Sequence, residues 1–269
     1  MESRPPATVS EIPAFERTSV RWVKHWNEHL FSFAVERPPS FRFRSGEFIM
    51  IGLPGEGKPI MRAYSIASPS YADELEFLSI KVPYGPLTSK LQRIKQNDQI
   101  YLGRKPTGTL IADALLPGKR LFLLSTGTGL APFLSVIKDP DIYARFEEII
   151  LVHSVRRTSD LAYRDELEAQ LAGDPLVQDE ALVQLHYIPT VTREKFRTTG
   201  RIRSLIESGE LFTGTLSHKH CFDPATDRIM LCGSMGMIRD FSDYFGALEF
   251  TEGSNAKPGQ YVIERAFVG

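Results

Sequence analysis

The chain has 269 residues, of which 42% are hydrophobic and 24% are charged, and its formal net charge is -1. This is the composition of a globular protein with room for two hydrophobic cores. No stretch combines a basic run with interleaved aromatic residues, so we expect no binding to nucleic acid. The two cysteines, Cys221 and Cys232, are too few for a disulfide framework or a four-cysteine iron-sulfur cluster. Any redox chemistry would therefore need an organic cofactor.

Residues 1 to about 112 have the pattern of short strands separated by Pro and Gly clusters. We expect strands at Thr18–His25, Leu30–Glu36, Glu47–Leu53, Arg62–Ala67, Leu75–Val82 and Gln99–Gly103. Six short strands with turn signals predict a closed, antiparallel Greek-key β-barrel. A single helix is expected within this region, over Pro86–Lys95, because Leu87, Leu91 and Ile94 recur at helical spacing.

From about residue 120 the pattern alternates between strand and helix. We expect strands at Leu121–Ser125, Ile149–His153, Leu182–Ile188, Ile229–Cys232 and Tyr261–Glu264. The clearest helix between them carries Ile238, Phe241, Phe245 and Leu248. Alternation of this kind predicts a Rossmann-like α/β domain with a five-stranded parallel sheet. We place the domain boundary at Leu115, which gives a barrel domain over 1–114 and an α/β domain over 115–269.

The stretch Leu121–Phe133 changes from strand to helix across Gly127-Thr128-Gly129. A turn of this kind aims free backbone N–H groups and the positive end of a helix dipole at one point, which suits a phosphate. The third glycine of the dinucleotide fingerprint is absent, and Pro132 falls in the first helical turn. A plain strand-to-helix connection fits the stretch by itself equally well.

Arginines follow the second and third strands of the expected sheet. Arg156 and Arg157 stand where an acidic residue would select NAD, so they favour the 2′-phosphate of NADP(H). Arg193 and Arg201 follow the third strand, at the same edge of the sheet. For any one of these arginines, a solvated surface position is the alternative.

The fourth strand runs into a second glycine turn, formed by Cys232, Gly233, Ser234 and Met235. Its position puts the cysteine in the ligand crevice of such a sheet, although a buried structural cysteine is the usual alternative. We do not expect a cysteine nucleophile, because no motif places His218 or His220 to activate it. The same polar loop, Ser217–Asp223, is a weak candidate for a metal site, and we expect no metal.

Two segments stand out in the barrel half. Arg62 and Tyr64 share one face of a strand, whereas Ala63 and Ser65 share the other. A cation beside an aromatic ring suits a ligand with an anionic part and a flat ring, although an edge-strand arginine beside a core tyrosine is equally consistent. The second segment opens the expected helix with Gly85, Leu87, Thr88 and Ser89, whose hydroxyls could cap the helix or bind a diphosphate.

Five motifs occur in order along the chain: RAYSIAS, KVPYGPLTS, STGTGLAP, CGSM and the terminal ERAFVG. Together they resemble the ferredoxin-NADP(+) reductase family, specifically its bacterial flavodoxin/ferredoxin reductases. The resemblance covers essentially the whole chain. It implies FAD on the barrel and NADP(H) on the parallel sheet.

On the flavin side, the resemblance implies that Arg62, Thr88 and Ser89 hold the FAD diphosphate and that Tyr64 stacks on the isoalloxazine. Ser65 would lie near the reactive N5 atom. The remaining flavin contacts that we expect are Ala63, Lys81, Val82, Gly85 and Leu87.

On the nucleotide side, the resemblance assigns the 2′-phosphate to Arg156, Arg193 and Arg201. It assigns the nicotinamide and diphosphate to Thr126, Gly127, Thr128, Gly129, Pro132, Cys232, Gly233, Ser234 and Met235. At the chain end, Ala266 would pack on the flavin and Phe267 would point towards the adenine. We expect Tyr64, Ser65, Cys232, Glu264 and Ala266 to be the catalytic residues.

The implied activity is hydride transfer between NADP(H) and FAD, coupled to one-electron exchange with ferredoxin or flavodoxin. Residues 1–120 carry 17 Lys and Arg against 12 Asp and Glu, a net charge of +5, and the remainder carries 15 against 21, or -6. An acidic carrier would therefore fit the flavin half. No apolar segment is long enough to span a membrane and the first residues lack a signal core, so we expect a cytoplasmic protein. We also expect a monomer. The alternatives are a flavin reductase component serving an oxygenase or cytochrome, and a slow flavin redox sensor.

Overall fold

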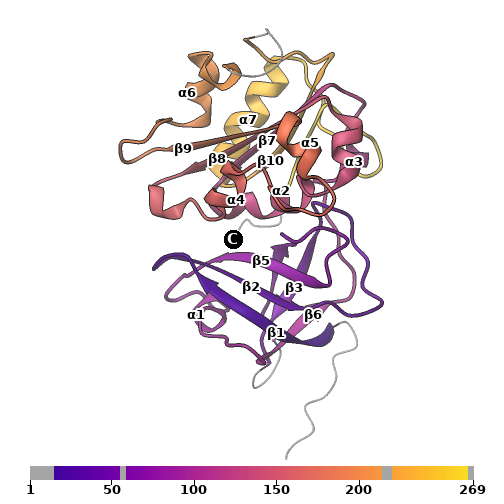
Figure 1. The fold of residues 1–269 in the computed structure, drawn as a ribbon, viewed down its shortest axis with the longest axis vertical. Helices are drawn as coiled ribbons and strands as arrows, with labels where there is room; N and C mark the ends of the chain where they lie inside the picture. The colour runs from indigo at the N-terminus through magenta and orange to yellow at the C-terminus, as the bar shows by residue number, and fades with distance from the viewer. Residues whose placement is uncertain (1–14, 55–58, 214–219, 266–269) are drawn as a thin grey trace, which may run out of the picture.

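The computed structural model describes residues 15–54, 59–213 and 220–265. It has two halves, an antiparallel barrel and a parallel sheet with helices on both faces (Figure 1). This confirms the expected fold class. The division into domains at Leu115 stays a prediction.

The barrel consists of six strands in the order β4-β3-β6-β1-β2-β5. Their bounds are β1 Phe15–His25, β2 Leu30–Glu36, β3 Phe48–Gly52, β4 Met61–Ser65, β5 Glu74–Ile80 and β6 Gln99–Gly103. The two edge strands come together just after β4, where the Ala67 N–H donates to the Glu76 carbonyl at 2.8 Å. This bond closes the barrel.

The helix of the barrel half, α1 (Thr88–Leu91), is shorter than the expected Pro86–Lys95. The side chains of Leu87, Leu91 and Ile94 are nevertheless buried in the barrel core. After α1 the backbone forms turns whose hydrogen bonds join residues three apart in the sequence. The chain then reverses at Asn97, whose φ is +73°. Periodic burial therefore extends further than the helix itself.

The parallel sheet has the order β11-β10-β7-β8-β9. Its strands are β7 Arg120–Thr126, β8 Glu148–Val155, β9 Leu185–Val191, β10 Asp227–Cys232 and β11 Tyr261–Ile263. The expected start of the third strand at Leu182 is wrong, because residues 182–184 end the helix α5 (Gln178–Gln184). Leu182 and Val183 are each 65% exposed, so these apolar residues lie on the outer side of a helix.

Alternate residues of each central strand face opposite helical layers. One layer consists of α2 (Ala131–Val136), α3 (Pro140–Arg145), α4 (Arg164–Glu168) and α5, and the other of α6 (Ile202–Glu207) and α7 (Met235–Ala247). Short 3₁₀ helices complete the order: η1 Ala112–Ala114, η2 Gly127–Leu130, η3 Thr158–Asp160 and η4 Glu210–Phe212. Leu248, expected in the last helix, follows α7 and is 36% exposed.

The two halves share one apolar core. Leu30, Ala67 and Leu78 of the barrel half belong to the same buried cluster as Leu123 and Phe133 of the sheet half. Alternate residues of β2 and β5 therefore face either the barrel interior or the other half. Within the described residues, no helix is both long and apolar enough to cross a membrane.

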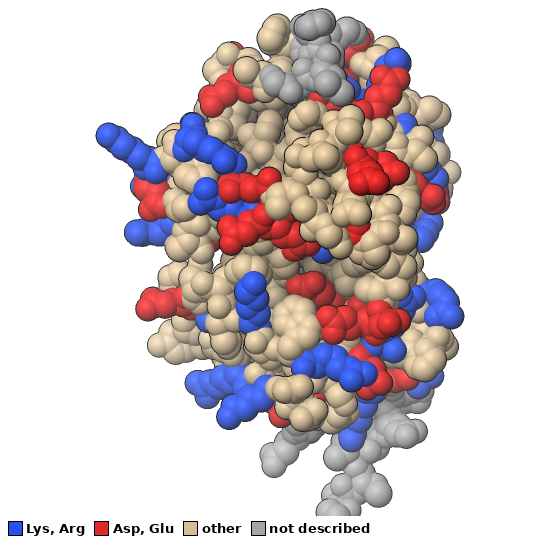
Figure 2. Space-filling model, in the orientation of Figure 1, with Lys and Arg blue, Asp and Glu red and all other residues tan. Residues whose placement is uncertain are grey.

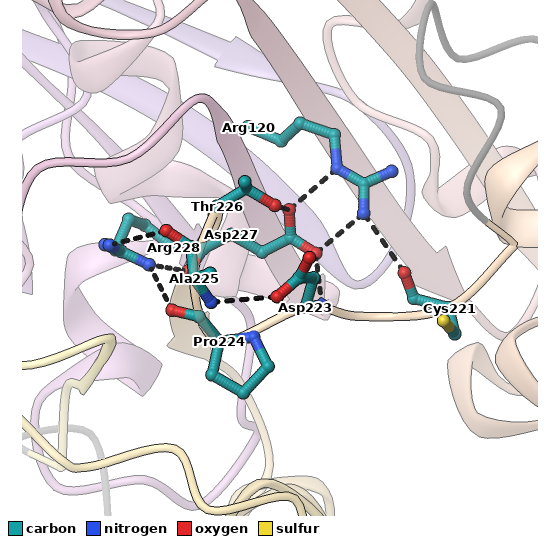
Figure 3. A network of polar contacts seen from close by, with 8 residues as sticks. All are labelled: Arg120, Cys221, Asp223, Pro224, Ala225, Thr226, Asp227 and Arg228. Carbon is teal, nitrogen blue, oxygen red and sulfur yellow. Dashed lines mark hydrogen bonds and ion pairs between the residues drawn. The ribbon is translucent and has the colours of Figure 1, made fainter.

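A buried ion pair holds the amino ends of β7 and β10 together (Figure 3). The Arg120 guanidinium donates to both carboxylate oxygens of Asp227, each at 2.7 Å, and both side chains are almost fully buried. Asp227 also accepts from the Asp223 N–H and the Thr226 hydroxyl, and Arg120 donates to the Cys221 carbonyl. The carboxylate is thus fully satisfied by local donors.

We predict that D227N lowers the free energy of unfolding by about 3–5 kcal/mol, because it leaves the Arg120 charge buried without a counter-ion. Urea unfolding of the purified protein measures the change. The control is E147Q, which breaks the 2.9 Å Lys119–Glu147 pair, whose side chains are both more than 60% exposed. It should cost less than about 1 kcal/mol. Equal losses in both variants would contradict the role given to burial.

Candidate functional site

The carboxyl ends of β7 and β10 lie side by side where the strand order of the sheet reverses. β8 and β9 continue on one side of β7, whereas β10 and β11 lie on the other. Cys232, the last residue of β10, is paired with Ser125 of β7. In open parallel sheets, such a reversal leaves a crevice at the carboxyl edge in which ligands bind.

The two glycine turns that follow these strands contact each other through their backbones. A Cβ atom on Gly129 would lie 2.2 Å from the Cys232 carbonyl oxygen, and one on Gly233 would lie 2.1 Å from the Thr126 Oγ1 atom. The Ser234 N–H donates to the same Thr126 oxygen at 2.9 Å. Both positions therefore require glycine, because the neighbouring turn comes too close to leave room for a side chain.

Gly127 has a different requirement. Its φ is +56°, in the left-handed region, and a Cβ atom there would meet nothing within 4 Å. The turn is thus open on this side. Pro132 lies in the first turn of α2, as expected. An open glycine turn at the carboxyl edge of a parallel sheet fits the diphosphate of a nucleotide.

His153 of β8 supports this turn, although sequence reasoning missed it. Its Nε2 atom lies 3.1 Å from the Gly127 carbonyl oxygen, and Nδ1 lies 3.5 Å from the Tyr187 hydroxyl. A carbonyl only accepts, so Nε2 carries the proton of a neutral imidazole. Complete burial lowers the pKa of His153 to about 4. The sequence signal that could have identified His153 is the presence of one titratable residue within an otherwise apolar strand.

Cys232 and Glu264 lie together at the end of β10. Burial, with a smaller contribution from the Glu264 charge, raises the pKa of the Cys232 thiol, which therefore stays protonated at neutral pH. Glu264 Oε2 accepts from the Thr109 N–H at 3.3 Å, and its own N–H donates to the Leu231 carbonyl. Glu264 thus connects the end of β10 to the barrel half.

The arginines meet at the ends of β8 and β9. The Arg193 N–H donates to the Arg156 carbonyl at 3.0 Å, and Arg201 immediately precedes α6. These two side chains, Arg156 and the neighbouring Arg157 are exposed. Basic side chains project from this end of the sheet half in Figure 2. Among the described residues, Arg156, Arg193 and Arg201 form no ion pair, so the group fits a 2′-phosphate.

In the barrel half, β4 has the expected alternation only in part. Arg62 is exposed, but Tyr64 is 8% exposed, with its ring edge-to-face against Phe33 and Phe77 and its hydroxyl 3.3 Å from Ser79. The tyrosine therefore lies in the barrel core, and its stacking on a flavin stays a prediction. On the other face, Ser65 is buried and Ala63 is half-buried.

The segment after β5 presents apolar side chains to solvent. Val82 is 38% exposed and Tyr84 98% exposed. Gly85 follows, where a Cβ atom would lie 2.2 Å from the Thr88 hydroxyl oxygen. Large exposed apolar residues next to a glycine turn fit a flat ring system bound at the surface. Tyr84 was not among the expected site residues.

The other expected flavin contacts have local partners. The Lys81 ammonium donates to the Asn27 carbonyl, and the Ser89 N–H donates to the Gly85 carbonyl. Leu87 is buried in the barrel core. Ala266 and Phe267 lie outside the described residues, as do Ser217 and His218 of the weak metal candidate. Across the described part of the chain, no group of three or more His, Cys, Asp or Glu could hold a metal ion.

An antiparallel barrel docked on a parallel sheet with interlocked glycine turns defines a class, the two-domain oxidoreductases that bind FAD and a pyridine nucleotide. Family models match in the same order, the oxidoreductase FAD-binding domain over residues 19–110 and the oxidoreductase NAD-binding domain over residues 123–243.

Individual relatives narrow this class. The ferredoxin–NADP reductase of Pseudomonas aeruginosa is 53% identical over 91% of this chain and 95% of its own length. The flavodoxin/ferredoxin–NADP reductase of Rhodobacter capsulatus is 48% identical over 100% and 98%. A ferredoxin NADP+ reductase of Neisseria gonorrhoeae, solved with bound FAD and NADP, is similar with a TM-score of 0.83 and 30% identity, over 95% of this chain and 100% of that one. The chain belongs to the ferredoxin–NADP reductase family.

We predict that His153 destabilises the protein in acid. Its pKa rises from about 4 when folded to the ordinary 6.5 when unfolded, so between these values the unfolded state binds the proton more readily. Stability is fully present above pH 6.5 and falls by up to about 3 kcal/mol as the pH approaches 4.

Urea unfolding between pH 4.5 and 7.5 measures this loss. H153Q keeps a donor but does not titrate, so its stability should depend less on pH over this range. The matched variant H29Q, in an exposed turn, should keep the wild-type slope. A wild-type slope in H153Q would contradict the assignment.

Proposed function

We propose that this protein is a ferredoxin/flavodoxin–NADP(+) reductase, with FAD held by the barrel and NADP(H) bound on the parallel sheet. The observation that carries the proposal is the pair of interlocked glycine turns at the strand-order reversal, connected to the barrel half through Glu264 and Thr109. The names of the relatives, which include both ferredoxin and flavodoxin, support the choice of acceptor.

A bound FAD would supply the chemistry that couples a two-electron hydride donor to a one-electron acceptor. The chain's own residues orient the partners. The open turn at Gly127 receives the nucleotide diphosphate. His153 holds the carbonyl group of Gly127 in place. Cys232 lines the crevice as a neutral thiol, which adds no charge at the point where the nicotinamide meets the flavin. Such positioning supplies much of the rate of a transfer reaction.

The flavin half would bind through the remaining expected contacts. Arg62 is an exposed cation for the FAD diphosphate, and Val82 and Tyr84 offer apolar surface to the ring system. Glu264 lies between the two halves, where it can hold a proton near the reacting atoms. We also propose that the protein acts in the cytoplasm as a monomer and that its domains divide at Leu115. The gap between the two family models, from residue 111 to 122, supports that boundary.

We predict that R193A and R201A each weaken NADPH binding by one to two decades, because each removes a charged hydrogen-bonding partner of the 2′-phosphate, worth about 1.5–3 kcal/mol. NADH, which lacks that phosphate, should be used nearly as well as by the wild type. Steady-state KM values for both nucleotides measure this. R21A, on the barrel strand β1, is the control and should leave both values unchanged. An equal loss with NADH would show that these arginines do not bind the 2′-phosphate.

The acceptor is tested by NADPH oxidation with purified flavodoxin, ferredoxin or ferricyanide. Basic side chains gather on the lower barrel around α1 and β1 on the face shown in Figure 2, in line with the charge of +5 on residues 1–120. We predict that raising the salt concentration slows carrier reduction more than ferricyanide reduction, because steering of an acidic protein is screened. Equal salt dependence would reject docking on the basic barrel. Rapid ferricyanide reduction without carrier reduction would favour a component for another acceptor, and slow turnover with all three would favour a redox sensor.

A further inference from the structure

A directed chain of hydrogen bonds crosses from the barrel half to the sheet half. The Trp26 indole N–H donates to Ser32 Oγ at 2.8 Å, the Ser32 and Tyr163 hydroxyls are 2.5 Å apart, and the Tyr163 hydroxyl donates to Glu76 Oε1 at 2.5 Å. An indole can only donate and a carboxylate can only accept. The Ser32 proton therefore points to Tyr163, and every donor in the chain has an acceptor.

Of the four residues joined by these hydrogen bonds, Trp26, Ser32 and Glu76 belong to the barrel half and Tyr163 to the sheet half. It is 7% exposed, and its ring packs on Trp26 with the ring centroids 4.7 Å apart. The Lys24 ammonium lies 3.7 Å from the centroid of Trp26. The backbone φ of Tyr163 is +59°, an unfavourable value for a tyrosine, so its surroundings impose the conformation. Burial raises the pKa of Tyr163, which keeps the hydroxyl protonated as a donor.

Glu76 and Tyr163 are each joined to elements that lead into the proposed site. Glu76 accepts the Ala67 N–H at its carbonyl and donates its own N–H to Ser68 Oγ at 3.1 Å, and both partners directly follow β4. On the other side, Tyr163 follows β8 and the 3₁₀ helix η3. That helix also contacts the barrel, where the Asn27 amide donates to Asp160 Oδ1 at 3.0 Å.

The apolar core shared by the two halves holds them together but does not fix their orientation, because burial of apolar surface is non-directional. Hydrogen bonds have narrow distance and angle limits. The bond between Tyr163 and Ser32 is buried, and the bond from Tyr163 to Glu76 is partly buried. The other tyrosine contact between the halves, from the Tyr71 hydroxyl to both Asp174 oxygens at 3.1 Å, is exposed to solvent. Water can replace that contact at little cost.

We propose that Tyr163 is a positioning residue, whose hydroxyl bond to Glu76 sets the orientation of the sheet half on the barrel and so the alignment of β4 with the glycine turns. The docking role stands on the contacts alone. Its effect on the reaction rests on the function proposed above.

The activity test compares Y163F with Y71F, a matched loss of one hydroxyl at the same interface. At saturating NADPH, stopped-flow reduction of the bound flavin should be at least tenfold slower in Y163F and within twofold of wild type in Y71F. Binding of NADP+, measured by calorimetry, should be unchanged in both. A wild-type rate in Y163F overturns the proposal, and so does weaker NADP+ binding at an unchanged rate, which would place Tyr163 in the nucleotide site.

A double-mutant cycle identifies the partner. E76A should slow flavin reduction as Y163F does, and the double variant should be no slower than the slower single variant, because both changes remove the same bond. E76Q keeps an acceptor oxygen and should restore most of the rate. Fully additive effects of Y163F and E76A overturn the proposed pair.

A measurement without turnover separates failure of this proposal from failure of the proposed function. W22F leaves Trp26 as the sole tryptophan, so fluorescence then reports on the ring that packs against Tyr163. In this background Y163F should shift the emission to longer wavelength and speed amide exchange at Ala67 and Glu76, whereas Y71F should do neither. Unchanged emission and exchange overturn the docking role, whether or not the protein reduces a carrier.

Discussion

The approach of two backbones at the centre of the parallel sheet is the constraint on which the site depends. Gly129 lies against the carbonyl of Cys232, and Gly233 lies against Thr126, with no room for a side chain at either position. Because the turns interlock, backbone groups of both turns meet at this part of the carboxyl edge of the sheet. Cys232, the last residue of β10, is buried directly before the second turn.

A buried pair at the amino edge of the parallel sheet is charged, whereas two buried titratable side chains at its carboxyl edge are neutral. At the amino edge, the Arg120–Asp227 pair keeps both charges. Local donors satisfy the Asp227 carboxylate, whereas Arg120 Nη1 is buried without a hydrogen-bond partner among the described residues. At the carboxyl edge, burial keeps His153 and Cys232 neutral. The first arrangement stabilises the sheet. In the second, the positive charge at the carboxyl edge comes from the exposed side chains of Arg156, Arg193 and Arg201.

The interface between the halves contains apolar contacts, which hold the halves together, and hydrogen bonds, which set their relative orientation. Leu30 and Leu78 of the barrel belong to the buried core of the sheet half, which brings the two halves into contact. The hydrogen bonds from Tyr163 to Ser32 and Glu76 then select one orientation among those that apolar burial would tolerate. A reaction between two ligands bound on different halves depends on that selection.

The sequence by itself determined the strands, the two glycine turns, the family and the basic residues near the expected 2′-phosphate, because these depend on local periodicity, backbone freedom and short motifs. It wrongly predicted a strand starting at Leu182, where the structure has the last residues of the helix α5, because Leu182 and Val183 are apolar and their exposure cannot be read from the pattern. Only the tertiary structure decided the burial of Tyr64 in the barrel core, the support of Gly127 by His153 and the contact of Tyr163 with Glu76. Residues 76 and 163 are far apart in the chain, and no local pattern determines which distant side chains meet when two hydrophobic surfaces pack together.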